Sequence, residues 1–101
     1  MTQVNITDLD QPRLEDLVEF PALIPVKAVS RKQVAQDEFH AALVDLTAQH
    51  VPGFVAELVT IRPSSQGNYF AATLSVTFLN VEQVHALDAA LKAHPLVRMV
   101  L

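Results

Sequence analysis

Hydrophobic and polar residues alternate most regularly between Phe70 and Leu79. One side of an extended chain here would carry Phe70, Ala72, Leu74, Val76 and Phe78, and the other would carry Tyr69, Ala71, Thr73, Ser75 and Thr77. A period of two with one apolar side predicts a half-buried β-strand. The segment Phe54–Ile61 is rich in Val, Ile and Thr, which predicts a second strand just before it.

The residues between these two strands have the composition of a turn. Gly67 and Asn68 tolerate positive φ, and Ser64 and Ser65 can hydrogen-bond to nearby backbone groups. Pro63 has no N–H for a β-ladder, so we place it at a strand end or on a sheet edge. The whole segment therefore predicts an antiparallel hairpin with a long loop.

Two segments show the spacing of amphipathic helices. The first is predicted over Val34–His50, with a buried stripe consisting of Phe39, Leu43, Leu46 and His50, widened by Ala42. Pro52-Gly53 ends it. The second is predicted from Val81 to about Ala93, with a stripe of Val81, Val84, Leu87 and Leu91. Asn80 as N-cap and Gln83 three residues later form a capping box at its start.

The remaining apolar segments flank these elements. Phe20–Val29 predicts a first strand, whose regular part we place at Pro25–Val29 because of its two prolines, and Leu96–Leu101 predicts a last strand. The order β-α-β-β-α-β is that of a ferredoxin-like α+β domain. We expect an antiparallel four-stranded sheet of order 4-1-3-2 with both helices on one face. Residues 1–12 are interpreted as a flexible leader, Arg13–Glu19 as a helical turn, and 13–101 as the single domain.

Composition narrows the class of protein. The chain has 101 residues, 50% of them hydrophobic, which is enough for one folded domain. It contains no cysteine, which fits a reducing compartment, and no segment with the pattern of a signal peptide or membrane span. The net charge of −4 argues against a general polyanion binder. We expect a cytoplasmic protein that does not interact with a membrane.

No residue pattern indicates a particular chemistry. The four histidines, His40, His50, His85 and His94, lack the close spacing with a nearby acid that helical metal sites use. Ser64 and Ser65 lie in the turn without the surroundings of a nucleophile. Two glycines cannot build a phosphate-binding glycine loop. We therefore predict no catalytic residue, no metal and no cofactor.

The face of the sheet without helices is the first candidate for a binding surface. Tyr69, Thr73, Ser75 and Thr77 should lie there, and Lys27, Arg62 and Arg98 join them if the strand register allows. The alternative is an ordinary solvated sheet face. RNA-binding domains of this topology stack bases on aromatic residues of the first and third strands, whereas here the third strand offers only Tyr69, so nucleic-acid binding is disfavoured.

Several motifs together resemble those of the YbeD-like family of bacterial proteins. They are Leu17-Val18-Glu19-Phe20-Pro21, Lys27, Pro63-Ser64-Ser65-Gln66-Gly67-Asn68-Tyr69, Glu82-Gln83-Val84 and Val97-Arg98-Met99-Val100-Leu101. The resemblance covers about residues 13–101 and implies a ferredoxin-like fold similar to the ACT regulatory domains, with no established activity. Gln66 stands where a lysine is common in the family, and Ser30 where a glycine often follows the first strand.

These observations favour a non-enzymatic binding or regulatory module that acts through protein contacts or a small effector. Its candidate binding residues are Ser64, Ser65, Gly67, Asn68, Tyr69, Lys27, Arg62 and Arg98. The alternative is an enzyme accessory subunit whose site forms at a subunit interface, since edge strands two and four could pair between chains in a homodimer. Nucleic-acid binding is a third possibility.

Overall fold

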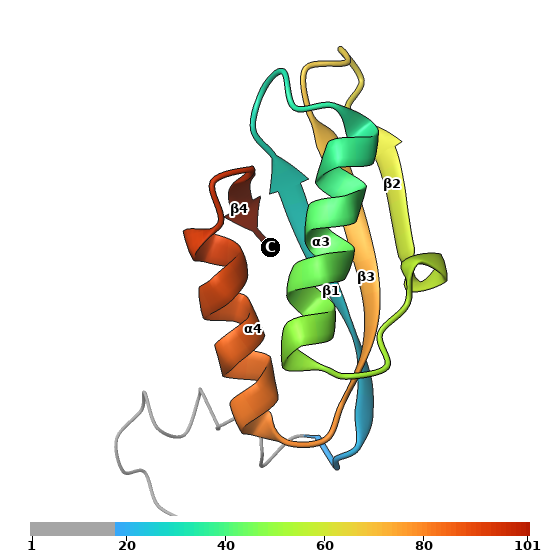
Figure 1. Cartoon of the computed structure of the whole chain (residues 1–101), viewed down its shortest axis with the longest axis vertical. Coiled ribbons are helices and arrows are strands. Elements are labelled where there is room, and N and C mark those ends of the chain that lie inside the picture. The colour runs from blue at the N-terminus through green and yellow to red at the C-terminus, as the bar shows by residue number, and fades with distance from the viewer. Residues whose placement is uncertain (1–17) are drawn as a thin grey trace, which may run out of the picture.

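A computed structural model describes residues 18–101, and within this range the chain forms two layers. Figure 1 shows the two helices, α3 (Gln36–His50) and α4 (Val81–Ala93), side by side on the viewer's side of the sheet. The strands are β1 (Ala22–Ser30), β2 (Val59–Pro63), β3 (Phe70–Phe78) and β4 (Val97–Val100). Their order is β2-β3-β1-β4, which confirms the predicted order and the ferredoxin-like fold. The predicted helical turn at Arg13–Glu19 lies largely outside the described residues.

The alternation along β3 decides which face of the sheet is buried. Ala72, Leu74, Val76 and Phe78 are all buried beneath the helices, whereas Ala71 and Thr77 are exposed. Phe39 and Leu43 of α3 and Leu87 and Leu91 of α4 complete the centre of the core. The predicted orientation of β3 is therefore confirmed, and within residues 18–101 no helix lies over the opposite face of the sheet.

Asn80 caps α4 as predicted, but Gln83 reaches back to the N–H of Leu79, one residue before the N-cap position that a capping box uses. The side-chain oxygen of Asn80 accepts a hydrogen bond from the Gln83 backbone N–H at 3.0 Å. The Gln83 side chain accepts in turn from the Leu79 N–H at 2.7 Å, and its amide nitrogen donates to the His50 carbonyl at 3.3 Å. Gln83 thus joins the beginning of α4 to the end of α3.

The prediction for the second strand was wrong at its beginning. Residues Ala56–Leu58 form a short 3₁₀ helix, η1, and β2 begins only at Val59. Ala, Glu and Leu, the three residues of η1, are good helix formers. Val55 and Leu58 are both exposed, so residues 55–58 lack the alternation of buried and exposed side chains that a strand would show. Pro63 is the last residue of β2, which lies at a sheet edge, as predicted.

The regular part of the first strand is longer than predicted, although the strand begins at Ala22 rather than Phe20. β1 pairs with β3 without interruption from Ala22, and Pro25 lies opposite Ser75. Lys27 accepts a hydrogen bond from the Leu101 N–H on the β4 side, and backbone groups alternate sides along a strand, so Pro25 also faces the β4 side. The described pairing between β1 and β4 covers only Ala28–Ser30 of β1, so the missing N–H of Pro25 interrupts no ladder bond.

The first helix differs from its prediction in two details. It begins at Gln36 rather than Val34, after Ala35, whose side chain cannot cap it. Its buried stripe consists of Phe39, Leu43 and Thr47, while Leu46 and His50 are only half-buried. The prediction considered only apolar residues, so it missed Thr47, the last residue of the buried stripe.

Candidate functional site

The open face of the sheet carries a hollow between a lysine and an arginine. In the strand register, Thr73 lies opposite Lys27 on one side and Thr60 on the other, and Ala71 lies opposite Arg62. The small side chains of the central strand leave a space of about 310 Å³ that these residues line. We call this space, lined by Lys27, Thr60, Arg62, Ala71 and Thr73, the strand hollow.

A second hollow lies at the end of the same face, beside the hairpin loop. Arg31, Lys32, Tyr69 and Arg98 line a space of about 290 Å³, which we call the loop hollow. The Arg98 guanidinium carbon is 4.9 Å from the centre of the Tyr69 ring, and the Lys32 ammonium nitrogen is 5.9 Å from it. Both cations are therefore close enough for a cation–π interaction with one aromatic ring.

The side chain of Ser30 holds together the backbone segments next to the loop hollow. Ser30 is fully buried, and its hydroxyl accepts a hydrogen bond from the Phe70 N–H at 2.9 Å while donating to the Arg31 carbonyl at 3.0 Å. The hydroxyl thus ties the end of β1 to the start of β3. Figure 1 shows the β1–α3 loop and the β2–β3 loop at the same end of the molecule.

Arg31 is held by the connection between α4 and β4. Its backbone N–H donates to the Leu96 carbonyl at 2.9 Å, and its side-chain Nε donates to the Pro95 carbonyl at 2.9 Å. An arginine anchored through Nε keeps the two terminal nitrogens of its guanidinium for another acceptor. The side chain is therefore positioned before any ligand arrives.

The hairpin loop presents Tyr69 and is itself closed by Ser64. The Ser64 N–H donates to the Tyr69 carbonyl at 2.8 Å, and the Ser64 hydroxyl accepts from the Tyr69 N–H at 3.2 Å. The Gly67 N–H donates to the Ser64 carbonyl at 2.9 Å, and Gly67 has the positive φ of 75° that a turn of this kind needs. Ser64 and Gly67 therefore hold the loop in shape, and the exposed Ser65 and Asn68 line neither hollow.

Charge is segregated between the two layers of the molecule. The helices carry acidic residues at Asp37, Glu38, Asp45, Glu82 and Asp88. Of the seven Lys and Arg residues in the chain, five line the two hollows, namely Lys27, Arg31, Lys32, Arg62 and Arg98. Within residues 18–101 the only ion pair joins Lys92 to Asp88 on α4, at 2.9 Å. The open face is therefore basic in a chain whose overall charge is negative.

The structure brings the predicted site residues together in two pairs. Tyr69 and Arg98 meet in the loop hollow, and Lys27 and Arg62 meet in the strand hollow. The sequence analysis did not include Arg31 and Lys32 among its candidate binding residues. The signal was their position directly after β1, because in an antiparallel sheet this end of β1 lies beside the start of β3, which Tyr69 immediately precedes.

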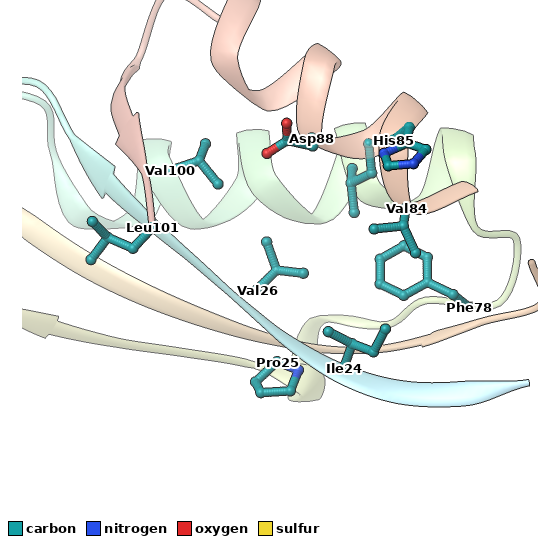
Figure 2. Close-up of a pocket in the computed structure, with 10 residues that line it drawn as sticks. Ile24, Pro25, Val26, Phe78, Val84, His85, Asp88, Val100 and Leu101 are labelled. Atoms are coloured by element: carbon teal, nitrogen blue, oxygen red, sulfur yellow. The ribbon is translucent and has the colours of Figure 1, made fainter. Parts of the chain in front are cut away.

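A third hollow, of about 200 Å³, is mainly apolar and lies between α4 and the part of β1 that β4 does not cover. Figure 2 shows Ile24, Val26 and Phe78 on the sheet side and Val84 on the helix side. His85 and Asp88 come from α4, and Asp88 is already paired with Lys92. In the part of the chain that the structure describes, no three His, Asp or Glu side chains are grouped closely enough to hold a metal ion. This hollow therefore offers apolar contact rather than a reactive set.

The fold and the two basic hollows define a small ferredoxin-like α+β domain with an open, positively charged sheet face. None of the helices within residues 18–101 has the length and apolar character needed to cross a membrane. The chain belongs to a family described as "Protein of unknown function (DUF493)", whose model matches residues 15–101. This agrees with the resemblance to the YbeD-like family.

Curated relatives match the chain over most or all of its length. A UPF0250 protein from Ralstonia nicotianae is 41% identical over 101 residues, which is 100% of both chains. One from Paraburkholderia phymatum is 38% identical and covers 89% of this chain and 98% of its own, and one from Neisseria meningitidis serogroup C is 38% identical and covers 91% and 98%. No solved structure matches the chain.

Proposed function

We propose that this protein is a non-enzymatic binding module that engages an anionic partner with the basic side of its sheet. The observation that carries the proposal is the gathering of five cationic side chains around two hollows on the open face, without a carboxylate partner within residues 18–101. Like charges that are held close together repel one another, and a bound anion relieves that repulsion. The partner is a small effector or an acidic segment of another protein.

The fixed positions of the cations support binding rather than a merely solvated surface. Arg31 is anchored through two hydrogen bonds to the α4–β4 connection, and Arg98 lies against the Tyr69 ring. Long side chains that are already ordered lose less conformational entropy when they contact a ligand. A surface that only maintains solubility has no need for such anchoring.

Binding of a labelled acidic peptide tests the proposal. Fluorescein-labelled hexaglutamate would be titrated with the full chain and followed by fluorescence polarisation. The proposal predicts saturable binding that weakens as salt is added, because exposed charges are screened. Arg98→Gln should weaken binding roughly tenfold, the value of one lost charge-assisted hydrogen bond.

The matched control for this experiment is Lys92→Gln. It removes the same charge from α4, where Lys92 is paired with Asp88 and lines neither hollow. Equal weakening by Arg98→Gln and Lys92→Gln would show that only net charge matters. That result, or the absence of saturable binding, would contradict a site on the open face.

A further inference from the structure

The loop hollow offers more positive charge and more donors than a single carboxylate can use. Arg31, Lys32 and Arg98 are three cations that line one space of about 290 Å³. A carboxylate carries one negative charge and two oxygens, which one arginine fork can satisfy. A phosphate monoester carries a charge of about −1.5 to −2 and three terminal oxygens, and so can accept from several donors at once.

The anchoring of the two arginines suits a tetrahedral oxyanion. The Nε of Arg31 is engaged by the Pro95 carbonyl, so its terminal nitrogens remain as donors. Arg98 lies over the Tyr69 ring at 4.9 Å, and a guanidinium that contacts an aromatic ring in this way can keep its own N–H groups for an acceptor. Lys32 adds a third positive charge over the same ring, at 5.9 Å.

We propose that the loop hollow is a binding site for a phosphate monoester, whose oxygens accept hydrogen bonds from Arg31, Lys32 and Arg98. The inference rests on the proposed function, because it names the anion that the basic surface takes at this end. The rest of the ligand would extend from the loop hollow over the open face toward Lys27 and Arg62. These two residues line the strand hollow, which also includes Ala71, two residues after Tyr69 in the chain.

The test compares two small ligands that differ in the anionic group. N-acetyl-phosphoserine amide and N-acetyl-glutamate amide would each be titrated into the ¹⁵N-labelled full chain at pH 7.5 and constant ionic strength. We expect the phosphate ligand to bind roughly tenfold more tightly, as one additional charge-assisted hydrogen bond implies. The amides of Arg31, Tyr69 and Arg98 should shift most.

Two variants and one pH series separate recognition from structural effects. Arg31→Lys keeps the charge but loses the guanidinium fork, so it should weaken phosphate binding several-fold. Arg98→Gln should do the same, whereas Lys92→Gln should change nothing. Because the second pKa of a phosphate monoester is about 6, affinity for the phosphate ligand should fall between pH 7.5 and pH 5 in the unaltered protein. This dependence follows from the ionisation of the ligand, so it identifies the doubly charged phosphate as the group that binds.

A ten-residue phosphoserine peptide distinguishes a protein source of the phosphate from a small molecule. Tighter binding of the peptide than of the blocked amino acid would support a phosphorylated protein partner, and equal binding would support a small phosphorylated ligand. Equal affinity for phosphate and carboxylate ligands, or shifts confined to the helices, would overturn the phosphate site. If hexaglutamate still bound at the open face in that case, the proposed function would stand without it.

Discussion

Replacing Thr47 by valine should stabilise the protein. Thr47 is fully buried in α3, and its hydroxyl is the one buried side-chain polar atom without a hydrogen-bond partner among the described residues. Valine has nearly the same shape and a similar helix propensity, so Thr47→Val removes the hydroxyl without opening a cavity. The variant therefore avoids the cost of desolvating a hydroxyl group that forms no hydrogen bond in the folded protein.

The expected gain follows from the cost of that unpaired group. Burying a hydroxyl without a partner costs about 1–3 kcal/mol in proteins, so Thr47→Val should raise the free energy of unfolding by about 1–2 kcal/mol. For a domain of this size each kcal/mol corresponds to a rise in Tm of about 4–8 °C. Thr47→Ser keeps the hydroxyl and deletes a buried methyl group, so it should lower the free energy of unfolding by about 1 kcal/mol.

Urea unfolding followed by circular dichroism measures both variants under one set of conditions. The two changes should have opposite signs, and the slope of unfolding free energy against urea concentration should stay constant. A destabilised or unchanged Thr47→Val protein would refute the reasoning. It would mean that the hydroxyl has a partner in solution, such as a buried water molecule.

Three further substitutions test the local interactions described above. Asn80→Ala removes the cap that accepts from the Gln83 N–H and should lower the free energy of unfolding by about 1 kcal/mol in urea titrations. Ser30→Ala leaves the Phe70 N–H without its acceptor and should cost about 1–2 kcal/mol; a smaller loss would show that water replaces the hydroxyl. Gly67→Ala places a side chain at a φ of 75° in open space, so thermal unfolding should reveal only the backbone cost of about 1 kcal/mol.

The fold was predictable wherever local pattern and tertiary environment agree. The alternation along β3 and the N-cap at Asn80 depend on short-range rules, and both were identified correctly. The start of β2 was missed because Val55 and Leu58 are apolar residues that the structure leaves exposed, which composition alone cannot reveal. The regularity of β1 through Pro25 depends on how far β4 extends, which is a property of the sheet rather than of the strand.

The candidate site was only partly predictable for a similar reason. Tyr69 and Arg98 were proposed from their strands, but their contact across the sheet depends on a register shift between β1 and β4 near Ser30. Arg31 and Lys32 belong to a loop, so no periodicity marks them. Ser64 and Gly67 were also proposed as binding residues, and their hydrogen bonds form the frame of the loop that holds Tyr69.

The most direct measurement of the central claim is a map of where an acidic ligand touches the protein. ¹H–¹⁵N correlation spectra of the full chain would be recorded during titration with unlabelled hexaglutamate. The account predicts that the largest amide shifts occur at Arg31, Tyr69, Arg98 and around Lys27, with the surfaces of α3 and α4 unaffected. Shifts centred on the helices, or on the apolar hollow beside α4, would contradict a basic open face as the binding surface.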